Sequence, residues 1–170
     1  ISIASRFDTT VYLLRAMNNI GDQLRQGMRI TVPKPGGVRL VVDKSDKHLY
    51  VYSSMEGTER KFIKRYPVGV AKYQERMPAG IYVVHDKIID PTWYPPDGGI
   101  IPPGDPRNAL GSRWMGFRQD GRDTSLGIHG TSEPETIGAD ASAGCIRMHN
   151  ADVEELFMLA RVGTEVEIVD

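Results

Sequence analysis

The feature that most constrains the fold is a strict alternation of apolar and polar residues that begins at residue 38. Alternating segments occupy positions 38–42, 48–52, 61–70 and 80–85. Short polar turns, such as 44–47 and 55–58, separate them. Period-two alternation with short connections is typical of strands that pair as antiparallel hairpins. We therefore expect a mainly β domain, an antiparallel β-sandwich.

The first 33 residues follow a helical pattern instead. Apolar residues at helical spacing predict two short helices, with Thr9 or Thr10 as the cap of the second. Residues 28–32 predict a short strand, and prolines and glycines then break regular structure. The chain is thus divided into an N-terminal unit (1–33), a linker (34–37) and a main domain (38–170).

A long segment at 91–111 interrupts the strands. It holds six of the eleven prolines together with four glycines. Loops of this length are commonly lids or binding walls, and the alternative is a disordered excursion. Because Trp93, Tyr94 and Ile100 provide apolar anchors, we predict that the segment forms the wall of a pocket.

The C-terminal part predicts two further strands, at 113–117 and 126–129. After them, apolar residues at 153–160 recur at helical spacing behind Asn150, a candidate cap. A last alternating strand follows at 164–169. We expect the helix to pack on the sheet.

Charge and cysteine content exclude several classes of protein. Lys and Arg number 21 against 22 Asp and Glu, so no strong field directs the chain to nucleic acid or an anionic membrane. No apolar run approaches the roughly 20 residues of a membrane span. The single cysteine allows neither an intramolecular disulfide nor a zinc site of the usual spacing, and His48, His85 and His149 do not form a ligand set.

The candidate catalytic residues lie between residues 128 and 148, where His129 and the only cysteine, Cys145, are close in sequence. A thiol attacks an acyl carbon as thiolate, and a histidine with a pKa near neutrality is a suitable base. Glycines adjoin both residues. Gly144 allows the chain to bend so that consecutive amides point at one oxyanion, and Arg147 is a candidate carboxylate clamp.

Simpler readings exist for each of these residues. A lone cysteine is usually a small buried hydrophobe, and a lone histidine is usually a core or surface residue. An arginine is more often a surface or salt-bridge residue. Glycine-rich turns at both His129 and Cys145 are hard to explain by packing alone, and they favour a catalytic pair.

These residues resemble the signature of a known family. The segments 128–131, 137–138 and 142–148, with Asn150, are similar to the L,D-transpeptidase catalytic domain of the YkuD type. Comparable segments at 67–69, 77–80 and 108–111 extend the resemblance to about residues 38–170. Two positions depart from the pattern: Ala143 stands where the family often has histidine, and Ala109 where proline is common.

The resemblance implies a peptidoglycan enzyme without cofactor or metal. Cys145 attacks the amide before the terminal D-alanine of a tetrapeptide stem, and a diamino-acid amine resolves the thioester into a 3-3 cross-link. His129 transfers protons, Ser142 orients the site, and the Gly144 and Cys145 amides form the oxyanion hole. Candidate substrate contacts are Arg147, Gly130, Thr131, Asn108 and Trp114.

Residues 1–33 resemble the later part of a LysM module, a glycan-binding unit whose first strand is missing here. The alternative is an ordinary helical hairpin packed on the main domain. Because the chain starts inside a helical pattern, we expect that an upstream segment with an export signal has been removed. The expected location is the periplasm or cell wall, and the expected state is a monomer.

Two other functions stay open at this point. Water instead of an amine would make the protein an L,D-carboxypeptidase or hydrolase. A protein with an inert site would be a non-catalytic wall-binding protein. The intact set of His129, Ser142, Gly144, Cys145 and Arg147 argues against the inert alternative.

Overall fold

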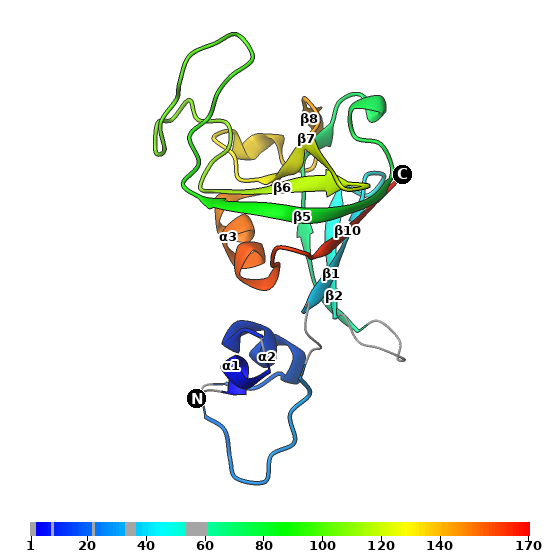
Figure 1. The fold of residues 1–170 in the computed structure, drawn as a ribbon, viewed down its shortest axis with the longest axis vertical. Coiled ribbons are helices and arrows are strands. Elements are labelled where there is room, and N and C mark those ends of the chain that lie inside the picture. Colours follow the sequence, from blue (N-terminus) through cyan, green and yellow to red (C-terminus); the bar gives the residue numbers. More distant parts are fainter. Residues whose placement is uncertain (1–2, 8, 22, 33–36, 54–60) are drawn as a thin grey trace.

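The computed structural model describes residues 3–7, 9–21, 23–32, 37–53 and 61–170 (Figure 1). One eight-stranded sheet dominates, with the spatial order β3-β2-β1-β10-β5-β6-β7-β9. Its strands are β1 (Val38–Asp43), β2 (His48–Ser53), β3 (Phe62–Pro67), β5 (Gly80–Ile89), β6 (Arg113–Gln119), β7 (Arg122–His129), β9 (Ile146–Arg147) and β10 (Glu165–Val169). Strands β4 (Val70–Ala71) and β8 (Asp140–Ser142) form a small second sheet. The expected mainly β architecture is confirmed.

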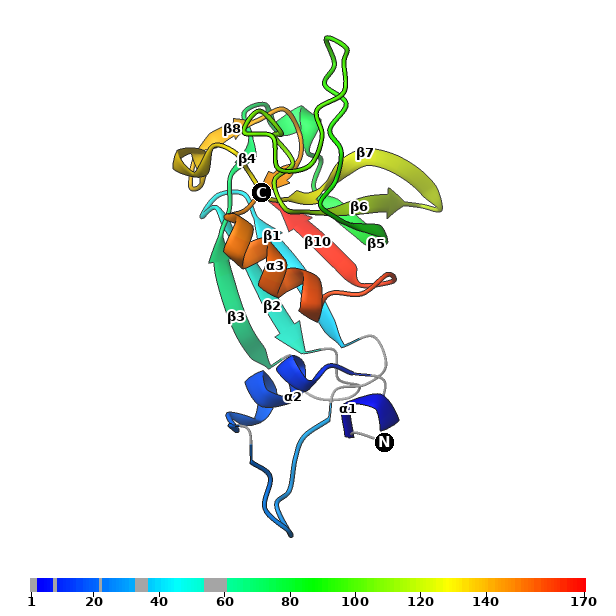
Figure 2. The same ribbon diagram turned by 90° about the vertical axis from the view of Figure 1, so that its left-hand side faces the viewer.

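Most neighbouring strands run antiparallel, as the hairpin pattern predicts, but two pairs in the large sheet are parallel. These are β1 with β10 and β7 with β9. The last strand, β10, lies between β1 and β5 and so joins the first hairpin to the β5-β6-β7 meander. The result is one curled sheet, and the helix α3 (Asn150–Leu159) lies against its inner side (Figure 2).

The predicted alternation sets which side chains enter the core. Burial alternates residue by residue along β1 and β2, so that Leu40 and Leu49 are fully buried. Helix α3 adds Val153, Leu156 and Leu159 to the same cluster. The helix packs on the sheet as expected.

The start of α3 differs from the expectation, because Asn150 is not its cap. His149 occupies the cap position without a side-chain bond, and Asn150 is the first helical residue. Its side chain instead accepts hydrogen bonds from the amides of Ser112 (3.2 Å) and Thr131 (3.1 Å) and donates to the Thr131 carbonyl (3.0 Å). Asn150 therefore ties two loops to the helix.

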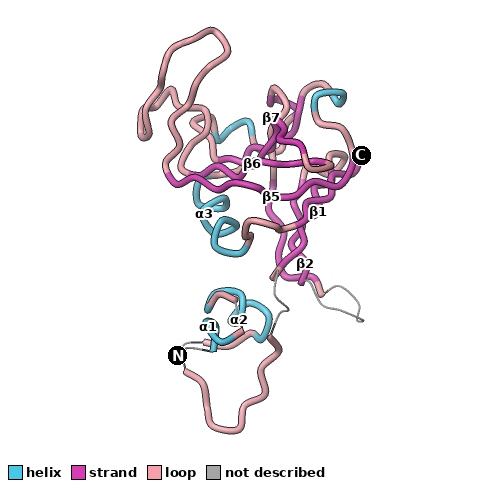
Figure 3. The backbone as a smooth tube through the Cα atoms, viewed as in Figure 1, coloured by secondary structure: helices cyan, strands magenta, loops and turns pink. Residues whose placement is uncertain are grey.

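The N-terminal helices are α1 (Ile3–Arg6) and α2 (Val11–Asn18), and Thr10 caps α2 through a hydrogen bond from the Leu13 amide. The strand expected at 28–32 is absent, and Figure 3 shows loop there. The Asn18 side chain binds both the amide and the carbonyl of Thr31, which satisfies this backbone without a partner strand. Leu13 and Met17 belong to the same apolar cluster as the sheet.

Two 3-10 turns and one long loop connect parts of the sheet. A 3-10 turn, η1 (Gln74–Arg76), precedes β5, and a second, η2 (Pro134–Thr136), lies between β7 and β8. The long loop 91–111 projects from the sheet beyond β5 and β6 (Figure 1). Among the described residues, no helix has the length and apolar character needed to cross a membrane.

Candidate active site

The pairing of β7 with β9 brings the two reactive residues together. In this parallel pair Ile128 lies beside Ile146 and His129 beside Arg147. Cys145 immediately precedes β9, so it lies beside the residues of β7 that come before Ile128. Its thiol donates to the carbonyl oxygen of Ser125 at 3.5 Å.

Cys145 and His129 line one pocket of about 900 Å³. The loop 91–111 contributes Trp93 and Tyr94 to its wall. This confirms the prediction that the loop bounds a pocket. Trp114 of β6 also lines it.

His129 is held in a fixed orientation. It is only 5% exposed, its Nδ1 lies 2.6 Å from the Gly130 carbonyl oxygen, and its ring stacks on Trp114 with centroids 6.0 Å apart. Since a carbonyl oxygen only accepts, we assign the proton of the neutral ring to Nδ1, which leaves Nε2 with a lone pair. Gly130 therefore acts on the imidazole through its backbone.

Burial is the main cause that lowers the pKa of His129 to about 4. The positive charge of Arg147 acts in the same direction, and hydrogen bonds with the carbonyls of Gly130 and Ala109 oppose it. Burial likewise raises the pKa of the Cys145 thiol, against the Gly127 backbone and the Arg147 charge. Both groups are thus neutral at pH 7. The imidazole can take the thiol proton while the sulfur attacks, as a general base does.

Ser142 holds the turn that carries the cysteine. It is 3% exposed, and its hydroxyl donates to the Cys145 carbonyl oxygen at 2.5 Å and accepts from the Gly144 amide at 3.3 Å. The Gly144 amide is therefore engaged within the turn, and it must exchange this long bond to bind an oxyanion. A Cβ on Gly144 would lie 3.2 Å from the Arg76 carbonyl, so this close approach favours glycine.

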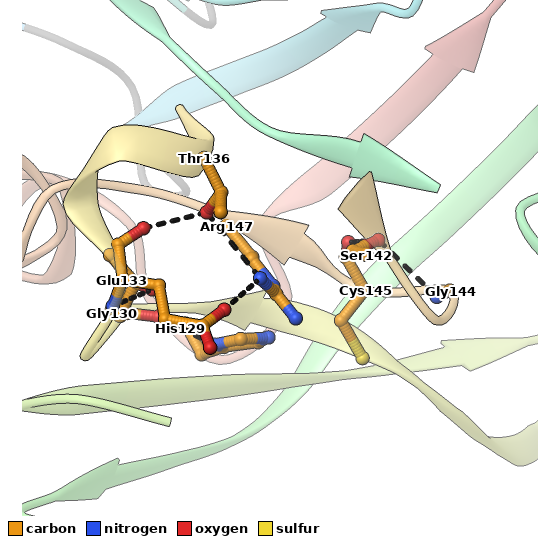
Figure 4. Close-up of polar contacts among 9 residues, drawn as sticks. His129, Gly130, Glu133, Thr136, Ser142, Gly144, Cys145 and Arg147 are labelled. Atoms are coloured by element: carbon orange, nitrogen blue, oxygen red, sulfur yellow. Dashed lines mark hydrogen bonds and ion pairs between the residues drawn. The ribbon is translucent and has the colours of Figure 1, made fainter. Parts of the chain in front are cut away.

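Arg147 has partners of its own. One terminal nitrogen of its guanidinium lies 3.0 Å from a carboxylate oxygen of Glu133 and 3.4 Å from the Thr136 hydroxyl. Figure 4 shows the guanidinium reaching the space between the imidazole and the thiol. Its position lets its charge favour the thiolate and disfavour the imidazolium, as the two pKa shifts indicate.

Three of the residues expected to contact substrate lie elsewhere. The Asn108 amide donates to three carbonyls of the long loop, including Pro91 at 2.9 Å, and its oxygen accepts from the Leu110 amide. Thr131 is buried beneath Asn150. Neither these two nor Gly130 is among the residues that line the pocket. Their polar groups hold loops in place, and contact of these residues with substrate stays a prediction.

Gly127 is a site residue that the sequence reasoning missed. It lies two positions before His129 on β7, on the same face of the strand. A Cβ there would lie 2.6 Å from the Met115 carbonyl and 2.8 Å from the Trp114 ring. The absence of a side chain leaves room for the Trp114 indole, which stacks on His129. The only sequence signal was a glycine inside a strand pattern, which often marks a close approach.

We expect Gly127→Ala to impair both folding and activity. The added methyl must displace Trp114 or the β6 backbone, which costs about 1–3 kcal/mol of stability. Thermal unfolding and thiol acylation rates measure the two effects. Gly21→Ala is the control, because nothing lies within 4 Å of a Cβ at Gly21. Equal melting temperatures for Gly127→Ala and the parent would contradict the steric argument.

The fold defines the class of protein. A crystal structure of a mutant L,D-transpeptidase from Enterococcus faecium superimposes with a TM-score of 0.59 at 23% identity, covering 80% of this chain. This chain spans 52% of that solved chain. The likeness shows that the curled sheet is the fold of L,D-transpeptidases.

Sequence comparison then gives the family. The family model of the YkuD L,D-transpeptidase catalytic domain matches residues 37–168. A putative L,D-transpeptidase, YqjB of Bacillus subtilis, is 38% identical over 81% of this chain and 74% of its own length. Putative L,D-transpeptidase YkuD of Bacillus licheniformis is 33% identical over 98% of this chain and 91% of its own length. The chain therefore belongs to the YkuD-type L,D-transpeptidase family, which implies a peptidoglycan substrate.

Proposed function

We propose that this protein is a peptidoglycan L,D-transpeptidase with Cys145 as nucleophile and His129 as base. The observation that carries the proposal is the shared pocket, in which a half-buried thiol and a fixed imidazole are both accessible to a ligand. No cofactor or metal enters the reaction.

The first half-reaction is acylation. The Cys145 sulfur attacks the carbonyl carbon of the amide before the terminal D-alanine of a tetrapeptide stem, and Nε2 of His129 accepts the thiol proton. The tetrahedral oxyanion lies near the Cys145 amide. Collapse breaks the C–N bond, His129 returns the proton to the leaving nitrogen, and D-alanine departs from a thioester.

The second half-reaction transfers the acyl group. The side-chain amine of a diamino acid on a neighbouring stem attacks the thioester carbon, and His129 accepts a proton from the attacking nitrogen. Collapse expels the thiolate, which takes that proton back from the imidazolium. The product is a 3-3 cross-link and the free thiol.

Hydrolysis is the second candidate, because water can resolve the same thioester. To separate the two, the protein is incubated with a tetrapeptide stem and a diamino-acid acceptor, and the products are resolved by liquid chromatography and mass spectrometry. Transpeptidation predicts mainly cross-linked dimer. A predominance of tripeptide would overturn the transferase proposal in favour of a carboxypeptidase.

Acylation by a carbapenem tests whether the site is reactive at all. A β-lactam carbonyl offers the same electrophile as the stem amide, and intact-protein mass spectrometry should show one adduct on Cys145. An unmodified protein after prolonged exposure would favour a non-catalytic wall-binding protein.

We further propose an extracytoplasmic location, at the periplasm or cell wall, where peptidoglycan lies. Residues 1–33 form a separate N-terminal unit in this proposal, joined by the linker 34–37 to the catalytic domain at 38–170. A LysM-like role would tether the enzyme to glycan and raise the local substrate concentration. The packing of Leu13 and Met17 into the common core supports the alternative, a helical hairpin that stabilises the main domain.

A further inference from the structure

The substrate pocket is electropositive. Two arginines, Arg76 and Arg147, are among the residues that line it, and none of the lining residues is acidic. A pocket with this charge balance favours an anionic ligand, because the low-polarity walls strengthen the field of each guanidinium. Either arginine could bind such an anion, so their other contacts decide between them.

Arg147 is already engaged. Its ion pair with Glu133 and its bond to Thr136 use one terminal nitrogen, and its side chain is only 16% exposed. A substrate carboxylate that displaced Glu133 from Arg147 would leave the Glu133 carboxylate without its cation. Arg147 is therefore better suited to adjusting the charge of the thiol and the imidazole than to holding substrate.

Arg76 has the opposite character. It ends the 3-10 turn η1, its side chain is exposed, and it makes no ion pair within the described residues. Its Cβ lies 3.8 Å, and its carbonyl oxygen 3.2 Å, from where a Cβ on Gly144 would be. The side chain thus leaves the backbone next to the turn that carries Cys145.

We propose that Arg76 binds the terminal carboxylate of the donor stem and so selects stems that end one residue beyond the cleaved amide. This proposal rests on the proposed transpeptidase function. The carboxylate of the leaving D-alanine is only one residue from the carbon that Cys145 attacks. A guanidinium beside the cysteine turn matches a carboxylate at that distance, and its planar fork can bind both oxygens at once.

The test compares two donor stems, one with a free terminal carboxylate and one with a terminal amide. For the parent protein we expect kcat/KM to be about 10- to 100-fold higher for the free acid, because a charge-assisted hydrogen bond contributes about 1.5–3 kcal/mol and about 1.4 kcal/mol equals tenfold. Arg76→Gln should lower the value for the free acid by a similar factor and leave the amide within about threefold. Arg76→Lys should restore part of the preference, since it keeps the charge but not the fork.

Binding without turnover gives a second readout. In a Cys145→Ala background, calorimetric titration with the free-acid stem should show about tenfold weaker binding or more when Arg76→Gln is added. Arg122→Gln is the matched control, because Arg122 is exposed at the far end of β7 and does not line the pocket. It should change neither binding nor the preference for the free acid.

Two results would overturn the proposal. An equal loss for the acid and the amide in Arg76→Gln would mean that Arg76 contacts another part of the stem, and no loss for either would mean that it does not contact the stem. If the proposed transpeptidase function were itself wrong, the result would differ, since the parent protein would form no acyl-enzyme from either stem.

Discussion

Cys145→Ala should lower donor-stem turnover by about 10⁴-fold or more. Removal of a covalent nucleophile eliminates the acyl-enzyme pathway and leaves only the binding and polarisation of the amide. The thiol is half-buried at the pocket wall, and alanine removes only its sulfur atom, so the variant should fold normally. Product formation is followed by chromatography, and acylation by intact mass.

The control for this variant is stability. We expect the melting temperature of Cys145→Ala to stay within a few degrees of the parent, because the substitution removes a single sulfur atom at the pocket surface. A variant that still carries a carbapenem adduct would show that another residue is the nucleophile. A variant that is inactive because it is unfolded would be recognised by its thermal transition.

His129→Ala should lower kcat/KM by about 10²- to 10⁴-fold, the range for loss of a positioned general base. The thiol pKa is raised by burial, so little thiolate exists at pH 7 without a proton acceptor. His149→Ala is the matched control, since His149 lies at the start of α3 and does not line the pocket. A His129→Ala variant with parent-like acylation rates would end its assignment as the base.

The pH dependence of the parent protein gives an independent check on His129. Only the neutral imidazole accepts a proton, so activity is lost as pH falls through the histidine pKa. Burial lowers this pKa to about 4, so the acidic limb should lie near pH 4 to 5 and not near 6.5. On the basic side, activity should persist to above pH 9, because the thiol pKa is raised from its ordinary value of 9.0.

A limb near 6.5 in the parent would mean that the imidazole is more hydrated in solution than its 5% exposure indicates. The same measurement on His129→Ala should lack the acidic limb. Arg147→Gln offers a graded test: loss of its charge should move the acidic limb upward and make the thiol still harder to ionise.

Local pattern was sufficient to predict most of the strands. Alternation in β1 and β2 gave the correct faces, because burial on one side of a sheet imposes period two on the sequence. The run at 61–70 was predicted as one strand but ends at Pro67, and the chain re-forms β4 at Val70. Proline has no amide hydrogen to continue the ladder.

Contacts between distant residues could not be predicted in this way. The insertion of β10 beside β1 depends on the whole topology, and the two parallel pairs depend on it too. Asn150 has the residue type and spacing of a helix cap, but its side chain bonds to loops 19 and 38 positions away in sequence. Residues 28–32 pair with no strand among the described residues, and the Thr31 backbone bonds to the Asn18 side chain instead.

The candidate site was predicted better than its supporting residues. Cys145 and His129 were recognised from their types and adjoining glycines, and the structure places both on one pocket. The role of Gly127 emerges only when Trp114 is seen to cover it. The partnership of Arg147 with Glu133 likewise depends on the turn η2, which no periodicity predicts.

The strand that follows the nucleophile is bonded along both of its sides. β9 pairs with β7 on one side, and on the other Arg147 and Gly69 exchange two backbone hydrogen bonds of 2.9 Å. Within the described residues no free ladder is left along β9, so a wall peptide cannot be recruited by strand addition next to the cysteine. Selectivity for donors and acceptors must then be encoded by side chains, and it can change by point substitution without disturbing the scaffold.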